Sequence, residues 1–439
     1  MAFYLNGVHV PHRKNTQDKS VIRMTPPERV VIPMSMHIGK PAVPTVKVGE
    51  LVKVGTLIAE ADGYVSSPVF ASISGKVVKI QDFLLSNGTT APAVVIESDG
   101  EMTPDESLTP PVITSKETLV DAIKNSGIVG LGGAGFPTHV KFNVATEQIE
   151  VLVINGAECE PYITSDTVTM TERRDDMAHA LKELSTHMGI KNVVIGIESN
   201  KKTAIESMKK LATAVAEFCS MTVKVLPAMY PQGGEKVLVY HTTGKTIPTG
   251  KLPIDVGCIV INCTTLAAIG SYLKTGMPLV EKCVTVDGGA VAEPSNVIAP
   301  IGASFADVFA CCTGLKAEPV KLIYGGPMMG VTAPNIDSPV LKNTNAILAL
   351  TEKEARLPKT TACIRCGTCT NTCPLGLAPA DIARAYEKRD TEALEALSVN
   401  ACMECGCCSF VCPANRPLVQ TNKLSKLLLR QAKQKEENK

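Results

Sequence analysis

Two runs of cysteines with identical spacing lie near the C-terminus of this 439-residue chain. Each run has the form C-x2-C-x2-C-x3-C-P, and the second repeats the first 39 residues later, so that position 363 corresponds to 402. The eight positions are Cys363, Cys366, Cys369, Cys373, Cys402, Cys405, Cys408 and Cys412. Thiolates are soft ligands for iron and zinc, so this internal repeat predicts a pair of metal centres.

The spacing favours iron–sulfur clusters over zinc. Runs of this form are typical of bacterial ferredoxins with two [4Fe–4S] clusters, in which the fourth cysteine of each run binds the other cluster. Structural zinc takes tetrahedral sets of four ligands, to which a cysteine triplet is poorly suited. The predicted ligands are Cys363, Cys366, Cys369 and Cys412 for cluster 1, and Cys402, Cys405, Cys408 and Cys373 for cluster 2. Cys407 is then interpreted as a spare buried thiol.

The composition limits the class of protein. The chain has 44 basic and 43 acidic residues, and this balance argues against a protein that binds nucleic acid. No run of about 18 apolar residues is present, and the first residues lack the pattern of a secretory signal. Because no export signal is expected, the 16 cysteines favour metal ligands over disulfides.

A glycine-rich stretch, GIVGLGGAGFPTHVK at 127–141, satisfies G-x-G-x-x-G with Gly130, Gly132 and Gly135. The dinucleotide fingerprint follows a strand and opens a helix, whereas this stretch follows a predicted helix with Ser115 as its cap and Gly127 as its stop. An ordinary Rossmann turn is therefore not expected. Dense glycine still indicates close backbone approach to a ligand, with free N–H groups for phosphate. A flexible turn is the alternative.

The segment 150–226 alternates between strand-like and helix-like patterns in the order β-α-β-α-β, which predicts a parallel sheet. Ligands of such sheets bind beyond the carboxyl ends of the strands. Those ends carry NGAECE at 155–160 and, after residue 227, AMYPQGGEK. We expect the functional side chains of this domain in these two loops.

Several stretches together resemble the RnfC family, the NADH-handling subunits of ion-translocating ferredoxin:NAD oxidoreductase complexes. They are GLGGAGFPTHVK, VINGAECEPYITSD, YPQGGEKVL, GGPMMG and the paired cysteine runs. The central part of that family is similar to the flavin subunit of respiratory complex I. The resemblance implies FMN between NAD(H) and the two clusters, because a flavin takes a hydride and passes single electrons. It implies no catalytic acid or base.

The resemblance also implies site residues. The positions that match FMN contacts are Gly132, Gly133, Gly135, Lys141, Asn155, Glu158, Gly233, Gly234, Glu235 and Asn262. Phe136, Glu160 and Tyr230 match the NADH side. One position departs from the complex I pattern, since Ala157 stands where that subunit has an aspartate.

The expected fold is a multidomain α/β and α+β protein. Its predicted parts are a barrel-sandwich module (1–101) that resembles lipoyl and biotinyl carriers, a parallel α/β flavin and NADH domain (112–275), a β-grasp module (276–335), a linker (336–360), a ferredoxin domain with two [4Fe–4S] clusters (361–420) and a basic tail (421–439). The barrel-sandwich module lacks a carrier lysine at its hairpin tip, which favours a structural role.

The resemblance further implies integral membrane and iron–sulfur partner subunits, an indirect exchange with ferredoxin, and a peripheral position on the cytoplasmic face of the cell membrane. Two alternatives keep parts of this interpretation. The first is a soluble flavin and iron–sulfur reductase of another pathway. The second is a cluster-only electron-transfer adapter with an empty flavin domain.

Overall fold

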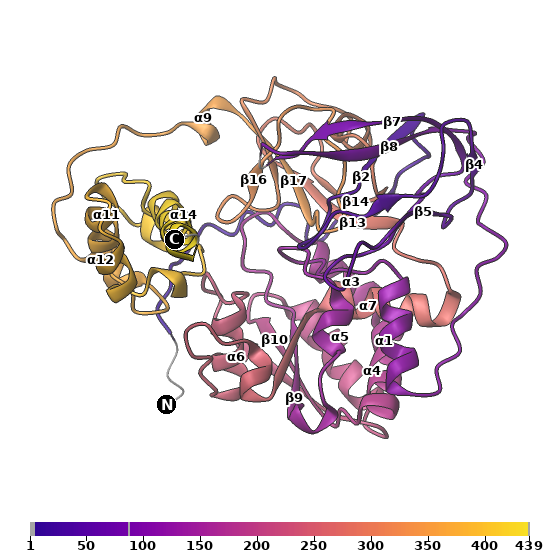
Figure 1. Cartoon of the computed structure of the whole chain (residues 1–439), viewed down its shortest axis with the longest axis horizontal. Helices are drawn as coiled ribbons and strands as arrows, with labels where there is room; N and C mark the ends of the chain where they lie inside the picture. The colour runs from indigo at the N-terminus through magenta and orange to yellow at the C-terminus, as the bar shows by residue number, and fades with distance from the viewer. Residues whose placement is uncertain (1–4, 87, 438–439) are drawn as a thin grey trace.

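The computed structural model of the protein describes residues 5–86 and 88–437, so the ends of the predicted N-terminal module and basic tail lie outside it. Figure 1 shows three parts. The helical domain with α1, α4 and α5 lies below a group of short-stranded sheets, and the C-terminal helices lie to one side, at the end of a long connector after α9. No helix in the described residues is long and apolar enough to cross a membrane.

A four-stranded parallel sheet forms the centre of the helical domain, as the alternating pattern predicts. Its order is β11-β10-β9-β12. The strands are β9 (Val151–Asn155), β10 (Asn192–Glu198), β11 (Ser220–Leu226) and β12 (Cys258–Asn262). Alternate residues of β9 pack on opposite faces, with Leu152 and Ile154 against one group of helices and Val153 against α6 (Glu235–Thr243). Helices cover both faces, as a parallel sheet requires.

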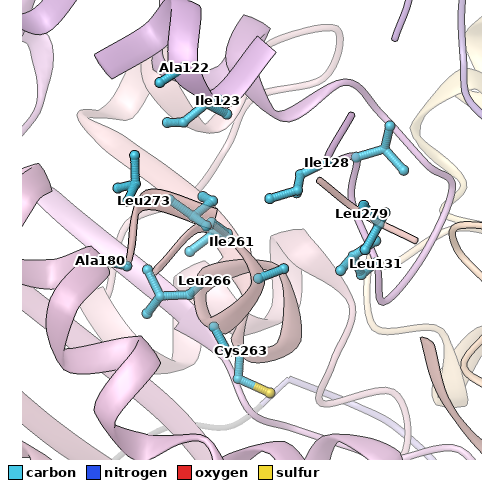
Figure 2. Packing of buried hydrophobic residues seen from close by; sticks show 14 of the residues in the cluster. Ala122, Ile123, Ile128, Leu131, Ala180, Ile261, Cys263, Leu266, Leu273 and Leu279 are labelled. Carbon is cyan, nitrogen blue, oxygen red and sulfur yellow. The ribbon is translucent and has the colours of Figure 1, made fainter. Parts of the chain in front are cut away.

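The remaining helices of this domain surround the sheet and the glycine-rich stretch 127–141, which we call the glycine loop. They are α1 (Lys116–Asn125), α2 (Thr138–Phe142), η1 (Thr146–Gln148), α3 (Ser165–Glu172), α4 (Arg174–Met188), α5 (Lys202–Ala214), η2 (Pro253–Val256) and α7 (Cys263–Thr275). The side chain of Ser115 accepts a hydrogen bond from the Thr118 N–H and caps α1 as predicted. Figure 2 shows Ile261, Leu266 and Leu273 close together in the core, with Leu131 and Leu279 beside each other to one side.

The N-terminal module consists of two small sheets, of order β2-β8-β7-β4 and β3-β5-β6. The strands are β2 (Arg29–Pro33), β3 (Val43–Pro44), β4 (Leu51–Val52), β5 (Leu57–Glu60), β6 (Val69–Phe70), β7 (Gly75–Leu84) and β8 (Thr90–Ser98). Val30, Ile32, Ile58, Val77 and Ile96 point inward and are buried, so the two sheets share one core.

The third sheet includes strands from outside the predicted β-grasp module (276–335). Its order is β1-β14-β13-β17-β15-β16, with α8 (Phe305–Ala310) in the same apolar cluster. The strands are β1 (Ile22–Arg23), β13 (Glu281–Asp287), β14 (Ser295–Pro300), β15 (Lys321–Tyr324), β16 (Val331–Thr332) and β17 (Ala346–Leu350). Strand β17 comes from the stretch 336–360, which the sequence presented as a linker, and all five of its residues are buried. Strand β1 comes from the N-terminal segment and extends the same sheet.

The C-terminal domain contains short helices around the two cysteine runs. They are α9 (Glu352–Ala355) before the connector, then α10 (Thr368–Thr372), α11 (Pro379–Glu387), α12 (Thr391–Ala396), η3 (Val399–Ala401), α13 (Cys407–Phe410) and α14 (Leu418–Glu437). Two helices, α11 and α12, lie between the cysteine runs: α11 ends with Lys388 as its C-cap, and Asp390 caps α12 by accepting from the Ala393 N–H. Ile382, Leu394 and Leu429 form a small core of their own.

Candidate functional site

The eight cysteines of the two runs line two separate cavities. One cavity is bordered by Cys373, Cys402, Cys405 and Cys408, with Cys407 also on its wall. The other is bordered by Cys363, Cys366, Cys369 and Cys412. The structure therefore brings the cysteines together in crossed sets, the fourth cysteine of each run joining the first three of the other.

The backbone around the two cavities has the same form. Arg365 and Gly367 have φ angles of 55° and 76°, and the corresponding Glu404 and Gly406 have 62° and 83°. These left-handed residues wrap each C-x2-C-x2-C turn around its cavity. The Thr368 hydroxyl donates to Cys366 Sγ at 3.3 Å and lowers the pKa of that thiol.

The donor set fits a cluster better than a single ion. Four thiols surround each cavity, yet no group of three His, Cys, Asp or Glu in the described parts of the chain is placed to hold one metal ion. Thiolates spread around a space suit an iron–sulfide cube, whereas zinc needs four donors at about 2.3 Å from one point.

The two cavities differ in exposure, and we name them accordingly. The distal site is the cavity of Cys363, Cys366, Cys369 and Cys412, and residues 361–367 on its outer side are all exposed. The proximal site is the cavity of Cys402, Cys405, Cys408 and Cys373, where Cys405 and Cys408 are buried. The difference arises because another part of the chain covers the proximal site.

That cover is an apolar junction between the C-terminal domain and the parallel-sheet domain. Its members are Val8, Val10, Cys159, Tyr230, Cys405 and Cys407, with Met328, Met403 and Val411 packed against them. The Tyr230 hydroxyl donates to the Cys405 carbonyl at 2.6 Å. A Cβ on Gly234 would lie 2.0 Å from Met403 Cε, so Met403 fills the space that this glycine leaves. Cys407, the predicted spare thiol, is 1% exposed in this junction.

The glycine loop lies at the point where the strand order of the parallel sheet reverses. The chain runs from β9 outward to β10 and β11, then returns to place β12 on the other side of β9. Asn155 and Asn262 are paired in register at the ends of β9 and β12. Open α/β sheets bind ligands at such a switch point, beyond the strand carboxyl ends.

The glycines of this loop have different surroundings. A Cβ on Gly132 would lie 2.6 Å from Asn262 Nδ2, so the loop touches the end of β12. A Cβ on Gly133 would meet no protein atom within 4 Å, and residues 132–134 are exposed. Gly135 has a φ of 72°. The loop therefore presents an open backbone surface at the switch point, which fits a phosphate-bearing cofactor.

Polar side chains beneath the loop are held by hydrogen bonds. Asn262 caps α7 by accepting from the Thr264 and Thr265 N–H groups, and its Nδ2 donates to Asp166 at 2.8 Å. Asn155 Nδ2 donates to the Gly233 carbonyl at 2.9 Å, which ties the two strand-end loops together. Asn155 and Asn262 therefore fix the relative position of three loops.

Two predicted charged residues, Lys141 and Glu235, flank the glycine loop. Lys141 Nζ donates to the Val260 carbonyl at 3.0 Å and lies 3.7 Å from Glu235. The Glu235 side chain is 46% exposed, and it begins α6 directly after Gly233 and Gly234. Neither side chain is fully buried, since Lys141 is 29% exposed as well.

The predicted residues Glu158 and Glu160 have partners within the protein. Glu158 is 5% exposed, accepts from the Asp166 N–H, and pairs with the buried Lys201 at 2.5 Å. Glu160 accepts from the N–H groups of Met328 and Met329, and burial raises its pKa to about 7. Both side chains hold loops in place in this structure.

The predicted NADH residues are divided between two places. Phe136 is half-buried in the glycine loop, whereas Tyr230 is 1% exposed and faces the C-terminal domain. A cavity borders the loop at Ala134, and its other walls come from two neighbouring parts, the N-terminal module and the module of the third sheet. The lining includes Ser35, Met36, His37, Ile38, Phe83, Tyr324, Leu341 and Asn343. Asn343 donates to the Gly133 carbonyl at 2.9 Å and connects this cavity to the loop.

Comparison with family models agrees with these parts. Residues 3–101 match the RnfC barrel sandwich hybrid domain, residues 123–271 match the Nuo51 FMN-binding domain, and residues 357–413 match the 4Fe-4S dicluster domain. The chain therefore carries an FMN-binding domain and a domain for two [4Fe–4S] clusters.

Curated relatives match nearly the whole chain. The RnfC protein of the Na⁺-translocating ferredoxin:NAD⁺ oxidoreductase complex of Acetobacterium woodii is 42% identical over 429 residues, which cover 96% of each chain. The chain belongs to the RnfC family. The RnfC protein of the proton-translocating complex of Clostridium ljungdahlii is 40% identical, over 88% of this chain and 84% of the relative. The corresponding values for the RnfC protein of the Rhodobacter capsulatus complex are 39%, 96% and 82%.

A solved structure shows that the fold of this RnfC-family chain extends to other proteins. The NAD⁺-reducing [NiFe]-hydrogenase in its H₂-reduced state aligns with a TM-score of 0.51 at 17% identity. The alignment covers 72% of this chain and 61% of the hydrogenase chain, so the likeness concerns the fold alone.

Sequence reasoning missed two residues of the RnfC-family site, Lys14 and Met403. Lys14 donates to the carbonyls of Glu158, Glu160 and Ile163, so an N-terminal segment supports a strand-end loop. No local pattern marks this lysine. Met403 was also missed, although its place between Cys402 and Cys405, opposite Ile364 in the repeat, was a usable signal.

Proposed function

We propose that this protein passes electrons between NAD(H), FMN and two [4Fe–4S] clusters as the RnfC component of a membrane-bound, ion-translocating ferredoxin:NAD⁺ oxidoreductase complex. The relatives described above are subunits of such complexes. Bound FMN supplies the exchange between a two-electron hydride and single electrons, which are what the clusters take up. The residues of this chain supply binding, orientation and contact.

One observation carries this proposal: the turn that holds the proximal site packs directly on the strand-end loop of the FMN-binding domain. Tyr230 bonds to the Cys405 carbonyl, and Met403 occupies the space above Gly234. Gly234 directly precedes α6 and Glu235, beside Lys141. Within the described residues, the turn of the proximal site therefore contacts the FMN-binding domain directly, with no other domain in between.

We assign FMN to the glycine loop at the switch point. Gly132 and Gly133 would let its backbone approach the flavin, with Asn155 and Asn262 below. Lys141 would offset the phosphate charge, and Gly233, Gly234, Gly135 and Glu235 would border the same space. Glu158 would act by holding the loop in place, because its carboxylate is already engaged by Lys201 and Asp166.

We assign NAD(H) to the open side of the same loop. Phe136 is half-buried there, and the cavity at Ala134 offers apolar and polar walls for the rest of a dinucleotide. Direct hydride transfer needs no protein acid or base, so these residues would position the nicotinamide. Glu160 and Tyr230 stay predictions for this side, although their present contacts favour a role at the junction with the clusters.

The positions of the two cluster sites set the order in which electrons would pass them. The proximal site lies at the junction with the FMN-binding domain, and the distal site lies beyond it with an exposed turn. Electrons that come from NADH would pass the proximal site first and leave at the distal site. The opposite flow would use the same order in reverse, and cluster potentials decide between them.

The relatives also support a place in a larger assembly. We propose a peripheral position on the cytoplasmic face of the cell membrane, beside integral membrane and iron–sulfur subunits that exchange electrons with ferredoxin. The basic tail is part of α14, where Lys423 and Lys426 lie near Glu404 and other lysines follow. Such a tail suits anionic lipid or an acidic protein surface.

The deciding experiment is anaerobic purification of the full chain, with flavin and iron quantified and NADH-dependent ferricyanide reduction measured. We expect one FMN and about eight irons per chain, together with NADH activity. Iron without flavin or NADH activity would favour the cluster-only adapter. Flavin, iron and NADH activity without co-purification of membrane subunits from the native cell would favour the soluble reductase.

A further inference from the structure

We propose that the exposed turn 363–367 at the distal site docks a one-electron carrier protein whose contact surface has an apolar centre and an acidic rim. The proposal rests on the proposed function, because it concerns the end of the same electron path. It names the side chains that make the contact and the chemistry of the partner surface.

The first observation is the internal repeat. Ile364 occupies the position in the first cysteine run that Met403 occupies in the second, 39 residues later. Both are apolar, and both lie between the first two cysteines of a turn with the same left-handed residues. The two turns are therefore equivalent surfaces of one small domain.

The second observation is that only one of these equivalent surfaces is covered. Around Met403 the chain places Tyr230, Gly234, Met328 and Val8, so that this turn meets the FMN-binding domain. Around Ile364 the described residues provide no such cover: Ile364 is 68% exposed, and all of 361–367 is exposed. A large apolar side chain beside exposed cluster ligands indicates a contact surface.

Because the two turns are equivalent, the contact of Met403 indicates the role of Ile364. Met403 fits a space at Gly234 of the FMN-binding domain and thereby fixes the proximal cysteines against that domain. Ile364 would fit a corresponding space on the next carrier and hold the distal cysteines close to it. An apolar centre of this kind is the usual anchor of a protein–protein contact.

Charge around the distal site selects the partner. The segments 359–367 and 412–416, which contain most of the lining of this site, hold three basic residues, Lys359, Arg365 and Arg416, and no acidic residue. Asp381, next to the lining residue Ala380, pairs with Arg384. Arg416 is paired with Glu387 at 2.7 Å, so Lys359 and Arg365 carry the exposed charge. In the covered turn the position of Arg365 is Glu404, which pairs with Lys426 at 2.7 Å. The open turn is therefore positive where the covered turn is negative, which favours an acidic partner surface.

The test measures equilibrium binding to the full chain with FMN and clusters in place. The probe is an oxidised, acidic bacterial ferredoxin with two [4Fe–4S] clusters, and cytochrome c serves as a basic counterpart. We expect Ile364→Asp and Arg365→Glu each to raise the Kd for the ferredoxin by about tenfold or more. Binding to the unaltered protein should weaken with salt, and Arg365→Glu should tighten binding of cytochrome c.

Matched variants at other sites control for charge and exposure. Val112→Asp places the same acid at another exposed apolar residue, and Lys79→Glu reverses an exposed charge on the barrel-sandwich module. Both should leave the Kd unchanged. Iron content and the electron paramagnetic resonance of both clusters must match those of the unaltered protein, and Ile364→Ser replaces the aspartate variant if that variant loses iron.

A Kd for the ferredoxin that stays within about twofold in both turn variants would overturn the proposal. Preferred binding of cytochrome c to the unaltered chain, or self-association that Ile364→Asp abolishes, would also overturn it. These outcomes leave the proposed function standing, because NADH-dependent ferricyanide reduction and flavin content report on it separately. Loss of those two properties in the unaltered protein would instead count against the proposed function.

Discussion

Asn155 and Asn262 are register partners at the carboxyl ends of β9 and β12, and Asn262 Nδ2 lies 3.4 Å from the Asn155 carbonyl oxygen. This pair sits where the strand order of the sheet reverses. Gly132 rests on the Asn262 side chain, and Asn155 holds the Gly233 carbonyl. Two asparagines thus position both glycine-containing loops at one edge of the sheet.

Asn262 has two roles that variants can separate. Asn262→Ala should remove both the cap of α7 and the bond to Asp166, whereas Asn262→Ser should keep the cap and lose only the bond. We expect the alanine variant to be less stable than the serine variant by about 1 kcal/mol in urea unfolding. Both should bind FMN more weakly than the unaltered protein. Equal stability of the two variants would contradict the capping role.

Gly133 is the position at which an added side chain should enter the flavin space without harming the protein. Because a Cβ there meets no protein atom within 4 Å, Gly133→Val should fold and retain its iron, yet lose FMN and NADH–ferricyanide activity. Flavin fluorescence and iron analysis check this. Ala214→Val, at the exposed end of α5, is the control and should keep both cofactors. Normal NADH activity in Gly133→Val would refute the flavin placement.

Crossed ligation makes a prediction that uncrossed ligation does not. Cys412→Ser should remove the distal cluster and leave a proximal cluster that NADH still reduces. Cys373→Ser should remove the proximal cluster and leave a distal cluster that NADH reduces only slowly. Electron paramagnetic resonance after NADH addition distinguishes the two variants. The reverse result would assign the fourth cysteines to their own runs.

Substitution of Met403 should slow electron transfer within the chain, whereas the same substitution of Ile364 should not. Met403→Asp puts a charge into the apolar junction at Gly234 and should slow reduction of the clusters by NADH by about tenfold or more. Ferricyanide reduction at the flavin should persist. Ile364→Asp, on the equivalent exposed turn, should leave cluster reduction unchanged. Stopped-flow absorbance under anaerobic conditions provides the rates, and equal rates in all three proteins would exclude the junction as the electron path.

Lys342 should make the stability of the protein depend on pH above neutrality. Its buried Nζ donates to Ser67 Oγ, the Pro68 carbonyl and the Gly127 carbonyl, and burial lowers its pKa to about 7 from 10.5. Between these values the unfolded chain binds more protons than the folded protein, so stability contributed by this group rises as pH increases.

Urea unfolding at pH 7, 8 and 9 checks this dependence. Lys342→Met should reduce the rise in the free energy of unfolding across that range, although it also removes three hydrogen bonds. Lys79→Met, at an exposed lysine, should leave the rise intact. An unchanged slope in Lys342→Met would show that the lysine stays charged in the folded protein.

Local chemistry explains which features the sequence predicted. Cluster ligands must lie within a few residues of one another, so their spacing is visible in the chain. The strands β9 and β10 are continuous apolar runs, VLVIN and NVVIGIE, as expected for a sheet that is buried on both faces. The cap at Ser115 was also visible, because it depends on residues three positions apart.

Features that depend on distant segments were not visible. Strand β17 reads AILAL, which has no alternation, and its place in the sheet is set by β13 and β15 far away in the chain. The family pattern assigned Glu158, Glu160 and Tyr230 to ligands, whereas their contacts here are to Lys201, Met328 and Cys405. Those contacts join parts of the chain that no local pattern relates.

The segment 5–23 makes its contacts with parts of the chain that are far away in the sequence. Val8 pairs with Tyr230, Asn15 bonds to Asp287, and Ile22 pairs with Val297. These partners are made long after the segment itself, so the segment cannot nucleate folding through them. Its pairing instead joins domains whose own cores form from contacts closer in the sequence.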